Sequence, residues 1–357
     1  MHHGGHVARP ASILADLEQV AQAATMRENF DVIVIGGSVA GLSAALITGR
    51  SRRSVLVVDA GEPRNAPAAG VHNLLGREGV APAELTRIGR DEVAAYGVEV
   101  TAGRVVAASA TAGTDTDPVG FSVTLDSGRV VTARRLVVAS GAVDVLPDVP
   151  GLAEQWGRGV VHCPFCHGWE IRDRRIGVLV TTPNGAHQVQ MFRALSDRVT
   201  AFVTDPDLLD DTARSAFRAR GVAVVEGPVA RVLSTDGVLT GVELGSGEVV
   251  PLDALAAAST AEPRVAFLEG LGLRAEDVVV NGFRVGGGLT VDVTGQTGVR
   301  GVWAAGNVTS PMVTVIASAA AGTQAGAAVH GDLVQADIAA ALAAAADRSV
   351  PTGQSTR

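Results

Sequence analysis

Runs of consecutive apolar residues, each ending at a turn, alternate along the chain with amphipathic or small-residue stretches. The first run is DVIVIGG (31–37), and it is followed by SVAGLSAALITGR (38–50) and SVLVVDA (54–60). Continuous apolar runs of this length are typical of strands buried in a parallel sheet, and the stretch between them has a helical period. The three segments therefore predict a strand–helix–strand unit.

A second unit of the same kind spans residues 176–203. Short strands and turns follow each unit, at 98–140 and 222–255, and the chain closes with GVWAAGNV (301–308) and an Ala/Gly-rich helix. Two similar halves predict an α/β fold with two Rossmann-like domains of the three-layer ββα type.

Both ends of the chain are predicted to lie outside these domains. MRENFDVIVIGG restarts at Met26 like a typical protein beginning, so residues 1–25 are interpreted as an N-terminal extension. Within it, ILADLEQVAQAA (13–24) has the period of an amphipathic helix. Residues 344–357 end in a polar, Ser/Thr-containing sequence and are expected to form a disordered tail.

Composition and charge exclude several classes of function. The 357 residues are 47% hydrophobic and carry a formal net charge of -8, which argues against nucleic acid or an anionic membrane as a partner. No run of about 18 uncharged apolar residues fits a membrane span, and the first 25 residues lack the pattern of a secretory signal. A cytoplasmic location is expected, where two cysteines at CxxC spacing are more often catalytic or metal-binding than structural.

The turn after the first strand has the spacing of a nucleotide-binding turn. Gly36 and Gly41 occupy the first and third positions of G-x-G-x-x-G, and Ser38 stands at the second. Serine is small and its hydroxyl can donate to phosphate, so the helix N-terminus still predicts a pyrophosphate site. Asp59 ends the next strand, where an acid binds a ribose hydroxyl and repels a 2′-phosphate.

Both cysteines lie in VVHCPFCHGWE, as Cys163 and Cys166. Pro164 suits the first position of a short helix, which would place Cys163 at the positive helix end and lower its pKa. His167 can move a proton at neutral pH. A redox-active CxxC is therefore favoured over a pair of buried, inert thiols.

A metal site is the other interpretation of this segment. His162, Cys163, Cys166 and His167 supply four ligand types, but adjacent His–Cys pairs crowd a tetrahedral ion, and the sequence has no second Cys/His knuckle. Zinc is therefore a minor alternative, and no metal is expected.

These motifs together resemble the thioredoxin reductase-like flavoproteins, and within them the FAD-dependent dithiol oxidases that close disulfides in natural products such as gliotoxin and holomycin. The similarity covers residues 26–333 and rests on five segments. They are VIGGSVAGLSAA, GEPRNAPAAGVHNLLGREG, SGA (140–142), CPFCHGWE and VWAAGNVTSPM.

The resemblance implies a discontinuous FAD-binding domain of residues 26–151 and 261–343. The central domain, residues 152–260, would carry the CxxC, and a homodimer is the family's usual assembly. Residues implied in FAD binding are Gly36, Gly37, Ser38, Ala40, Gly41, Asp59, Arg64, Asn65, His72, Val105, Ala142, Gly306, Asn307, Thr314 and Val315.

Two of these assignments carry chemistry of their own. Asn307 stands where the family has an aspartate near the ribityl chain, which keeps a polar contact and removes a charge. A helix beginning near Met312 would aim its N-terminus, around Thr314 and Val315, at the flavin and stabilise its anionic reduced form.

The turn of the second unit departs from a nicotinamide site. Val180 and Thr182 stand where glycine is needed, and only Gly185 remains. A β-branched side chain there blocks the approach of a pyrophosphate. Asp205 and Asp207 follow the next strand, where arginines would pair the 2′-phosphate of NADPH. NADPH is therefore not expected as a cofactor.

The resemblance implies an enzyme that oxidises a small-molecule dithiol, with oxygen as acceptor and hydrogen peroxide as product. Cys163 would exchange with substrate, Cys166 would pass electrons to the flavin, and His167 would deprotonate thiols. One alternative is a thioredoxin reductase-like disulfide reductase fed by NADPH or another donor. Another is a non-catalytic flavoprotein whose CxxC senses redox state or binds a partner.

Overall fold

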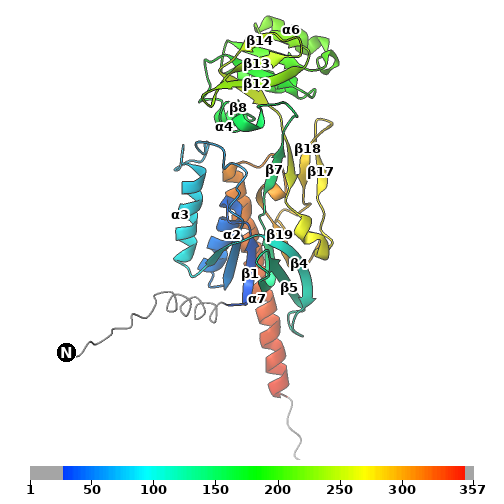
Figure 1. The fold of residues 1–357 in the computed structure, drawn as a ribbon. Coiled ribbons are helices and arrows are strands. Elements are labelled where there is room, and N and C mark those ends of the chain that lie inside the picture. The colour runs from blue at the N-terminus through cyan, green and yellow to red at the C-terminus, as the bar shows by residue number, and fades with distance from the viewer. Residues whose placement is uncertain (1–26, 350–357) are drawn as a thin grey trace, which may run out of the picture.

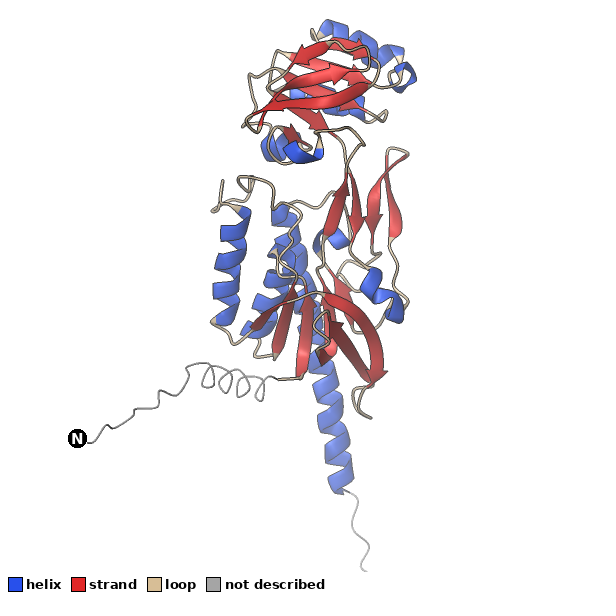
Figure 2. Ribbon diagram, viewed as in Figure 1, coloured by secondary structure: helices blue, strands red, loops and turns tan. Residues whose placement is uncertain are grey.

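The computed structural model describes residues 27–349, which form two α/β units stacked end to end (Figure 1). The predicted N-terminal extension, residues 1–25, lies outside the described residues. Figure 2 shows that each unit has its own sheet with helices beside it.

The first unit is built on a seven-stranded sheet in the order β3-β2-β1-β6-β5-β4, with β19 beside β6. Strands β3, β2, β1, β6 and β19 pair in parallel, and β6, β5 and β4 form an antiparallel extension. The strands are β1 (Asn29–Ile35), β2 (Val55–Asp59), β3 (Glu99–Ala102), β4 (Val105–Ala112), β5 (Val119–Leu125), β6 (Val130–Val138) and β19 (Val302–Ala304).

Three helices accompany this sheet, α2 (Val39–Arg50), α3 (Pro82–Ala94) and α7 (Val315–Ser349). Helices α2 and α7 cross closely because α7 carries glycine at the contact. A Cβ on Gly322 would lie 2.0 Å from the Ala40 carbonyl oxygen, so no larger residue fits there. This packing fixes the start of α7 beside the glycine turn.

The second unit has a five-stranded parallel sheet in the order β11-β10-β9-β15-β8 and a three-stranded antiparallel sheet β12-β13-β14. Its longer helices are α5 (Gly185–Arg193) and α6 (Asp211–Ala219), and a single turn, α4 (Pro164–His167), precedes β9. The strands are β8 (Val160–Val161), β9 (Ile176–Val180), β10 (Val199–Val203), β11 (Ala223–Glu226), β12 (Val229–Thr235), β13 (Val238–Leu244), β14 (Val249–Pro251) and β15 (Ala254–Ala257).

Two strands carry the chain between the units, β7 (Ala142–Val145) on the way out and β16 (Thr260–Pro263) on the return. They pair with each other antiparallel, and β16 continues into a sheet with β18 (Phe283–Gly288) and β17 (Glu276–Val280). The predicted α/β fold with two Rossmann-like domains is confirmed by this arrangement.

Helix α7 corrects one prediction about the C-terminus. The helix runs to Ser349, so residues 344–349 are helical and not part of a disordered tail. The remaining residues, 350–357, lie outside the described part of the chain. Small, helix-favouring alanines fill this stretch, and they outweigh the polar residues on which the prediction rested.

A buried ion network ties the first unit together. The Arg135 side chain on β6 is 1% exposed, and its guanidinium contacts the carboxylates of Asp117 and of Asp332 on α7. The neighbouring Arg134 bonds Asp31 and Asp337, so β1, β6 and α7 are joined by paired charges. Burying these charges is tolerable only while each keeps its partners.

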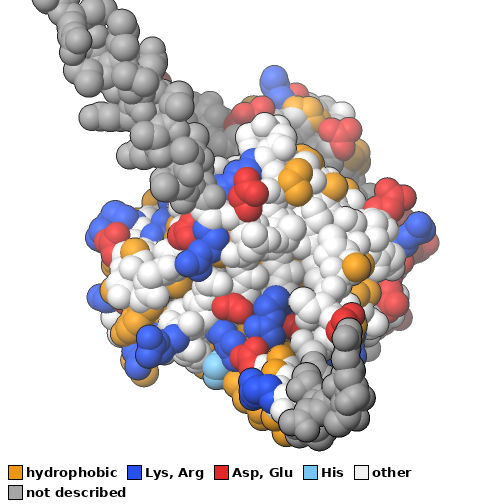
Figure 3. Space-filling model, turned by 90° about the horizontal axis from the view of Figure 1, so that it is seen from below, with side chains coloured by type: hydrophobic (Ala, Val, Ile, Leu, Met, Phe, Trp, Pro, Cys, Tyr) orange, Lys and Arg blue, Asp and Glu red, His pale blue; other side chains and the backbone are white. Residues whose placement is uncertain are grey.

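The surface seen from below carries charges of both signs (Figure 3). Lys/Arg and Asp/Glu side chains alternate over the described part of this face, without a broad area of one sign.

Among the described residues, no helix is long and apolar enough to cross a bilayer.

Candidate active site

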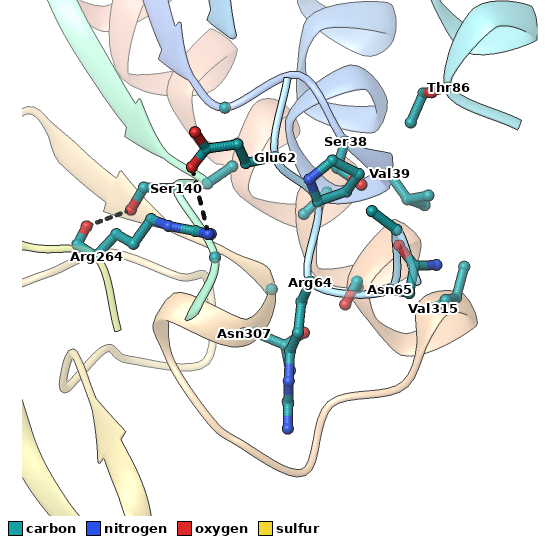
Figure 4. Close-up of a pocket in the computed structure, with 18 of the residues that line it drawn as sticks. Ser38, Val39, Glu62, Arg64, Asn65, Thr86, Ser140, Arg264, Asn307 and Val315 are labelled. Atoms are coloured by element: carbon teal, nitrogen blue, oxygen red, sulfur yellow. Dashed lines mark hydrogen bonds and ion pairs between the residues drawn. The ribbon is translucent and has the colours of Figure 1, made fainter. Parts of the chain in front are cut away.

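A cavity of about 1300 Å³ lies where the two units meet. Figure 4 shows side chains that reach it from the first glycine turn, the loop after β2 and the start of α7. Both cysteines and His167 line the same cavity from the second unit. The cavity thus brings the predicted nucleotide turn and the predicted redox centre together.

At two positions of the first turn, Gly36 and Gly41, the backbone leaves room only for glycine. Gly36 has φ +109°, and a Cβ there would lie 2.2 Å from the Ala139 carbonyl oxygen. A Cβ on Gly41 would lie 1.8 Å from the Gly36 carbonyl oxygen, so this glycine lets helix and strand pack closely. Ser38 caps α2 with its backbone carbonyl, which accepts from the Leu42 N–H at 2.9 Å, and its side chain makes no capping bond and lines the cavity (Figure 4).

Asp59 at the end of β2 holds this turn in place. Its Oδ1 accepts the Gly37 N–H at 3.0 Å, and Arg90 donates to Oδ2 at 2.5 Å. A Cβ on Gly37 would lie 2.7 Å from the Asp59 Cβ. The carboxylate lines the cavity, where it can accept from a ribose hydroxyl.

Arg64 makes contacts that its sequence context did not reveal. Its guanidinium donates twice to Asp144 on β7, at 2.7 and 3.0 Å, and once to the Pro311 carbonyl oxygen at 2.9 Å. Ser259 donates to the same Asp144 carboxylate at 2.7 Å. Arg64 therefore joins the loop after β2 to the strand that leads into the second unit, while still lining the cavity.

Asn307 uses its side-chain amide in a way that the aspartate expected from the resemblance could not. Its Nδ2 donates to the carbonyl oxygens of Ser310 at 3.2 Å and Val313 at 3.1 Å, which organises the turn before α7. A carboxylate could not make these bonds because it has no donor. Helix α7 then begins at Val315, three residues after the start near Met312 that the sequence predicts, with Thr314 lining the cavity beside it.

The CxxC begins a short helix, α4 (Pro164–His167), as predicted. Cys163 is the N-cap, and its carbonyl oxygen accepts the backbone N–H groups of Cys166 and His167, each at 3.2 Å. Both thiols are free. Figure 1 shows α4 on the side of the second unit that faces the first.

The two thiols differ in acidity. A hydrogen bond from the Cys166 side chain is the main cause that lowers the pKa of Cys163 to about 7. The backbone N–H groups of Cys166 and Phe165 and the charge of Arg64 also lower this pKa, whereas burial raises it. The same hydrogen bond, together with burial, raises the pKa of Cys166. Cys163 is therefore the thiolate of the reduced pair.

His167 is an unpaired base beside this pair. Neither ring nitrogen has a hydrogen-bond partner among the described residues, although both atoms are buried. Burial is the main cause that lowers the pKa of His167, and the neighbouring His72 and His162 lower it further, while Glu170 acts in the opposite direction. The ring is therefore neutral at pH 7 and able to accept a proton.

His162 lies on the other side of the cysteines and is already engaged. Its Nδ1 lies 3.2 Å from the Ala257 carbonyl oxygen, and burial lowers its pKa. Within residues 27–349, no group of three or more His, Cys, Asp or Glu side chains could hold a metal ion.

The turn of the second unit is filled by the protein itself. Strand β9 ends at Val180 and α5 begins at Gly185, so strand and helix lie where the sequence predicts them. A Cβ on Gly185 would lie 2.8 Å from the Val180 Cγ1, which makes this glycine a packing residue. The Asn184 Nδ2 donates to the Val280 carbonyl oxygen at 3.2 Å, so the turn contacts the β17–β18 hairpin of the first unit.

Two predicted residues do not line the cavity. Gly41 lies behind the turn, and Ala142 is 0% exposed in β7, where its carbonyl oxygen accepts from Arg264. The other predicted FAD-binding residues do line the cavity. They are Gly36, Gly37, Ser38, Ala40, Asp59, Arg64, Asn65, His72, Val105, Gly306, Asn307, Thr314 and Val315.

Sequence reasoning missed a group of lining residues around Arg264. Its carbonyl oxygen accepts from the Ser140 hydroxyl at 2.7 Å, and its guanidinium lies 3.7 Å from the Glu62 carboxylate (Figure 4). Ser140 stood beside the predicted Ala142, and the SGA motif was a signal for it. Arg264 lies in a segment without a motif, so no local signal could have found it.

Comparisons with known proteins identify the family. Residues 30–326 match the model of the pyridine nucleotide-disulphide oxidoreductases. The chain is 32% identical over 299 residues to "Thioredoxin reductase tcpT" of Claviceps purpurea, covering 78% of this chain and 86% of that protein. It is 30% identical to "Thioredoxin reductase sirT" of Leptosphaeria maculans, covering 89% and 98%.

A solved structure agrees over most of the fold. The crystal structure of HlmI superimposes with a TM-score of 0.83 at 40% identity, covering 91% of this chain and 99% of that one. The resemblance drawn from the sequence is thereby confirmed. The chain belongs to the pyridine nucleotide-disulphide oxidoreductase family and is a flavin-dependent oxidoreductase of the thioredoxin reductase-like kind.

Proposed function

We propose that this protein is an FAD-dependent dithiol oxidase that closes a disulfide in a small-molecule dithiol of natural-product type, with oxygen as the electron acceptor. One observation carries the proposal. An acidic Cys163, a protonated Cys166 and an unpartnered, neutral His167 line one cavity with the glycine turn. Thiol–disulfide exchange proceeds through attack of a thiolate on a disulfide, so a cysteine pair with one acidic thiol and a base nearby is suited to it.

The residues present fit FAD. The turn at Gly36 presents backbone that no side chain obstructs, and Asp59 can accept from a ribose hydroxyl. Gly306, with φ +83°, and Thr314 line the cavity from the C-terminal segment. When bound, FAD would supply a two-electron acceptor for the dithiol of the enzyme, from which oxygen could take the electrons as hydrogen peroxide.

The exchange itself uses only the side chains of the chain and the substrate. In the oxidised enzyme, one substrate thiolate attacks Sγ of Cys163, the Cys163–Cys166 bond breaks, and Cys166 leaves as a thiolate that takes up a proton. The second substrate thiolate then attacks the substrate sulfur of this mixed disulfide. That step forms the product disulfide and releases Cys163 as the thiolate.

His167 removes the protons that the substrate must lose. A small-molecule thiol with a pKa near about 8.5 is mostly protonated at pH 7, so a neutral imidazole beside Cys163 raises its reactive fraction. Because burial lowers the pKa of His167, the ring is in its accepting form under these conditions. Assigning exchange to Cys163 agrees with its lower pKa, since the better-stabilised thiolate is the better leaving group.

Three features of the second unit argue against NADPH as the electron source. Val180 and Thr182 replace glycines, Asn184 bonds the opposite hairpin, and Asp205 is exposed where a phosphate-binding arginine is needed. The proposal therefore places the electron source in the substrate. A homodimer and a cytoplasmic setting complete it, as the family resemblance implies.

Oxygen uptake tests the proposal. With a small dithiol, under air and without NADPH, the holoenzyme is expected to consume one oxygen and release one hydrogen peroxide for each disulfide formed. Cys163→Ser should abolish this turnover and retain the flavin. No oxygen uptake with a panel of dithiols would contradict the proposal.

A thioredoxin reductase-like activity is the second function to test, because the relatives from Claviceps purpurea and Leptosphaeria maculans are both called thioredoxin reductases. The assay is reduction of thioredoxin by NADPH, followed at 340 nm under nitrogen. We expect no NADPH consumption. Consumption that depends on Cys163 would establish the reductase instead.

A further inference from the structure

A short loop of the first unit reaches the CxxC helix of the second. Residues 71–80 form this loop, which we call the 71–80 loop, and the Val71 N–H closes its base by donating to the Val80 carbonyl oxygen at 2.8 Å. Within it, the Asn73 Nδ2 donates to the Phe165 carbonyl oxygen of α4 at 2.6 Å. This bond joins the loop that precedes α3 to the helix that carries the cysteines.

The 71–80 loop is braced in the conformation that makes this contact. Asn73 has φ +60°, a left-handed conformation that asparagine tolerates better than most residues. Both oxygens of the Glu78 carboxylate hold the loop there, because Oε2 accepts the Asn73 N–H at 2.8 Å and Oε1 lies 2.6 Å from the His72 Nδ1. Val71, 4% exposed, anchors the base of the loop. The Asn73 amide is therefore held in position by the first unit itself.

Helix α4 is too short to fix its own position. Its internal bonds include those from the Cys166 and His167 N–H groups to the Cys163 carbonyl oxygen, each at 3.2 Å. A helix leaves its last carbonyl groups without a partner inside the helix, and a helix of four residues has little stability of its own. The Phe165 carbonyl is one of these groups, and Asn73 supplies its donor. The position of α4 thus depends on a residue of the other unit.

The contacts of the 71–80 loop lie at the cysteines. Asn73 and His72 line the same cavity as both thiols, and the His72 Nε2 lies 3.5 Å from the Glu170 carboxylate, just after α4. Another bond between the units, from Asn184 to the Val280 carbonyl oxygen, lies at the β17–β18 hairpin, none of whose residues lines the cavity. The 71–80 loop is therefore a link between the units that acts where the redox pair lies.

We propose that Asn73, braced by Glu78, is a positioning residue that docks α4 on the first unit and so places the CxxC at the cofactor cavity. Reacting atoms must approach to about 3–3.5 Å, so a helix that moves away from the cavity loses rate. Neither residue takes part in the chemistry, and both act through the position of α4. The inference goes beyond the proposed function, because it holds whichever way electrons pass between the cysteines and FAD.

Hydrogen–deuterium exchange of the anaerobically reduced holoenzyme, followed by mass spectrometry on the peptide of residues 163–171, tests the docking without a substrate. Asn73→Gly keeps the left-handed backbone and removes the amide. It should raise the exchange rate of this peptide about 3- to 10-fold, the effect of losing one neutral hydrogen bond, and leave the β9 peptide unchanged. Glu78→Ala should do the same, although its bonds are to the loop alone. Asn281→Gly, at an exposed asparagine with φ +52°, is the matched control and should change neither peptide.

A second measurement links the docking to the chemistry. Excess dithiothreitol reduces a CxxC disulfide by thiol–disulfide exchange whatever the natural substrate is, and flavin bleaching under nitrogen then reports the step between the cysteines and FAD. Extrapolated to saturating dithiothreitol, the bleaching rate constant should fall about tenfold in Asn73→Gly and stay within about twofold in Asn281→Gly. A bleaching rate constant for Asn73→Gly within about twofold of wild type would overturn the proposal. So would unchanged exchange of the α4 peptide in Asn73→Gly, or an equal rise in the β9 peptide.

Discussion

The acidity of Cys163 in the reduced enzyme depends chiefly on Cys166, and replacing Cys166 with alanine tests this. The Cys166 hydrogen bond is the largest cause that lowers the pKa of Cys163 from 9.0 to about 7. At pH 7 a thiol of pKa about 7 is about half ionised, against about 1% at pKa 9, a gain of about 50-fold in thiolate. A thiolate of lower pKa is also less nucleophilic, by about eightfold for this difference, so the net gain in the reaction rate of Cys163 at pH 7 is about sixfold.

The assay is the pH dependence of alkylation by iodoacetamide, followed by mass spectrometry on the anaerobically reduced protein. The wild-type rate should rise through a midpoint near pH 7, because the thiolate forms above the pKa. Cys166→Ala should move that midpoint up toward 9. Cys163→Ser, which leaves only Cys166, should show little alkylation below pH 9, because burial still raises the pKa of Cys166 when the Cys163 hydrogen bond is gone. A wild-type midpoint near 9, or one that Cys166→Ala leaves unmoved, refutes this reasoning.

Three further predictions concern other parts of the site and fold. His167→Gln should lower kcat/KM for a small dithiol by about 10²- to 10⁴-fold at pH 7. At pH 9 the substrate thiols ionise without help, so the loss in kcat/KM should be smaller. A loss of the same size at both pH values would contradict the role of His167 as a base. Gly36→Ala should lower the flavin content of the purified protein, measured by absorbance, whereas Gly298→Ala, where a Cβ would meet no neighbouring atom, should keep it. Equal flavin content in the two variants would contradict the assignment of the Gly36 turn to FAD binding. Arg135→Ala should lower the free energy of unfolding, measured in urea, by about 3–5 kcal/mol. The control Arg300→Ala, at an exposed position, should lower it by less than about 0.5 kcal/mol. Similar losses in the two variants would contradict the buried network.

Features specified by neighbouring residues could be predicted from the sequence. The turn at Gly36, the acid at Asp59 and the start of α4 at Pro164 depend on glycine, on spacing and on a proline, all of which are local. The residues that depart from the pattern of a nicotinamide-binding site, Val180 and Asp205, could be recognised for the same reason. Apolar runs likewise predicted the parallel sheets.

Features that depend on distant partners could not be predicted. Nothing near Arg64 in the sequence indicates its bonds to Asp144 on β7, and the amide of Asn307 has a role only because the chain turns back before α7. The unpaired ring of His167 is a property of its three-dimensional surroundings.

The direction of electron flow is the central claim, and one anaerobic experiment tests it most directly. The oxidised holoenzyme is mixed in a stopped-flow instrument with benzene-1,2-dimethanethiol or, in parallel, with NADPH, and flavin absorbance near 450 nm is followed. The proposed function predicts bleaching by excess dithiol, with two product disulfides formed for each flavin reduced, because the Cys163–Cys166 disulfide and the flavin each accept two electrons, and return of the colour when air is admitted. Rapid bleaching by NADPH, with none by the dithiol, would contradict it.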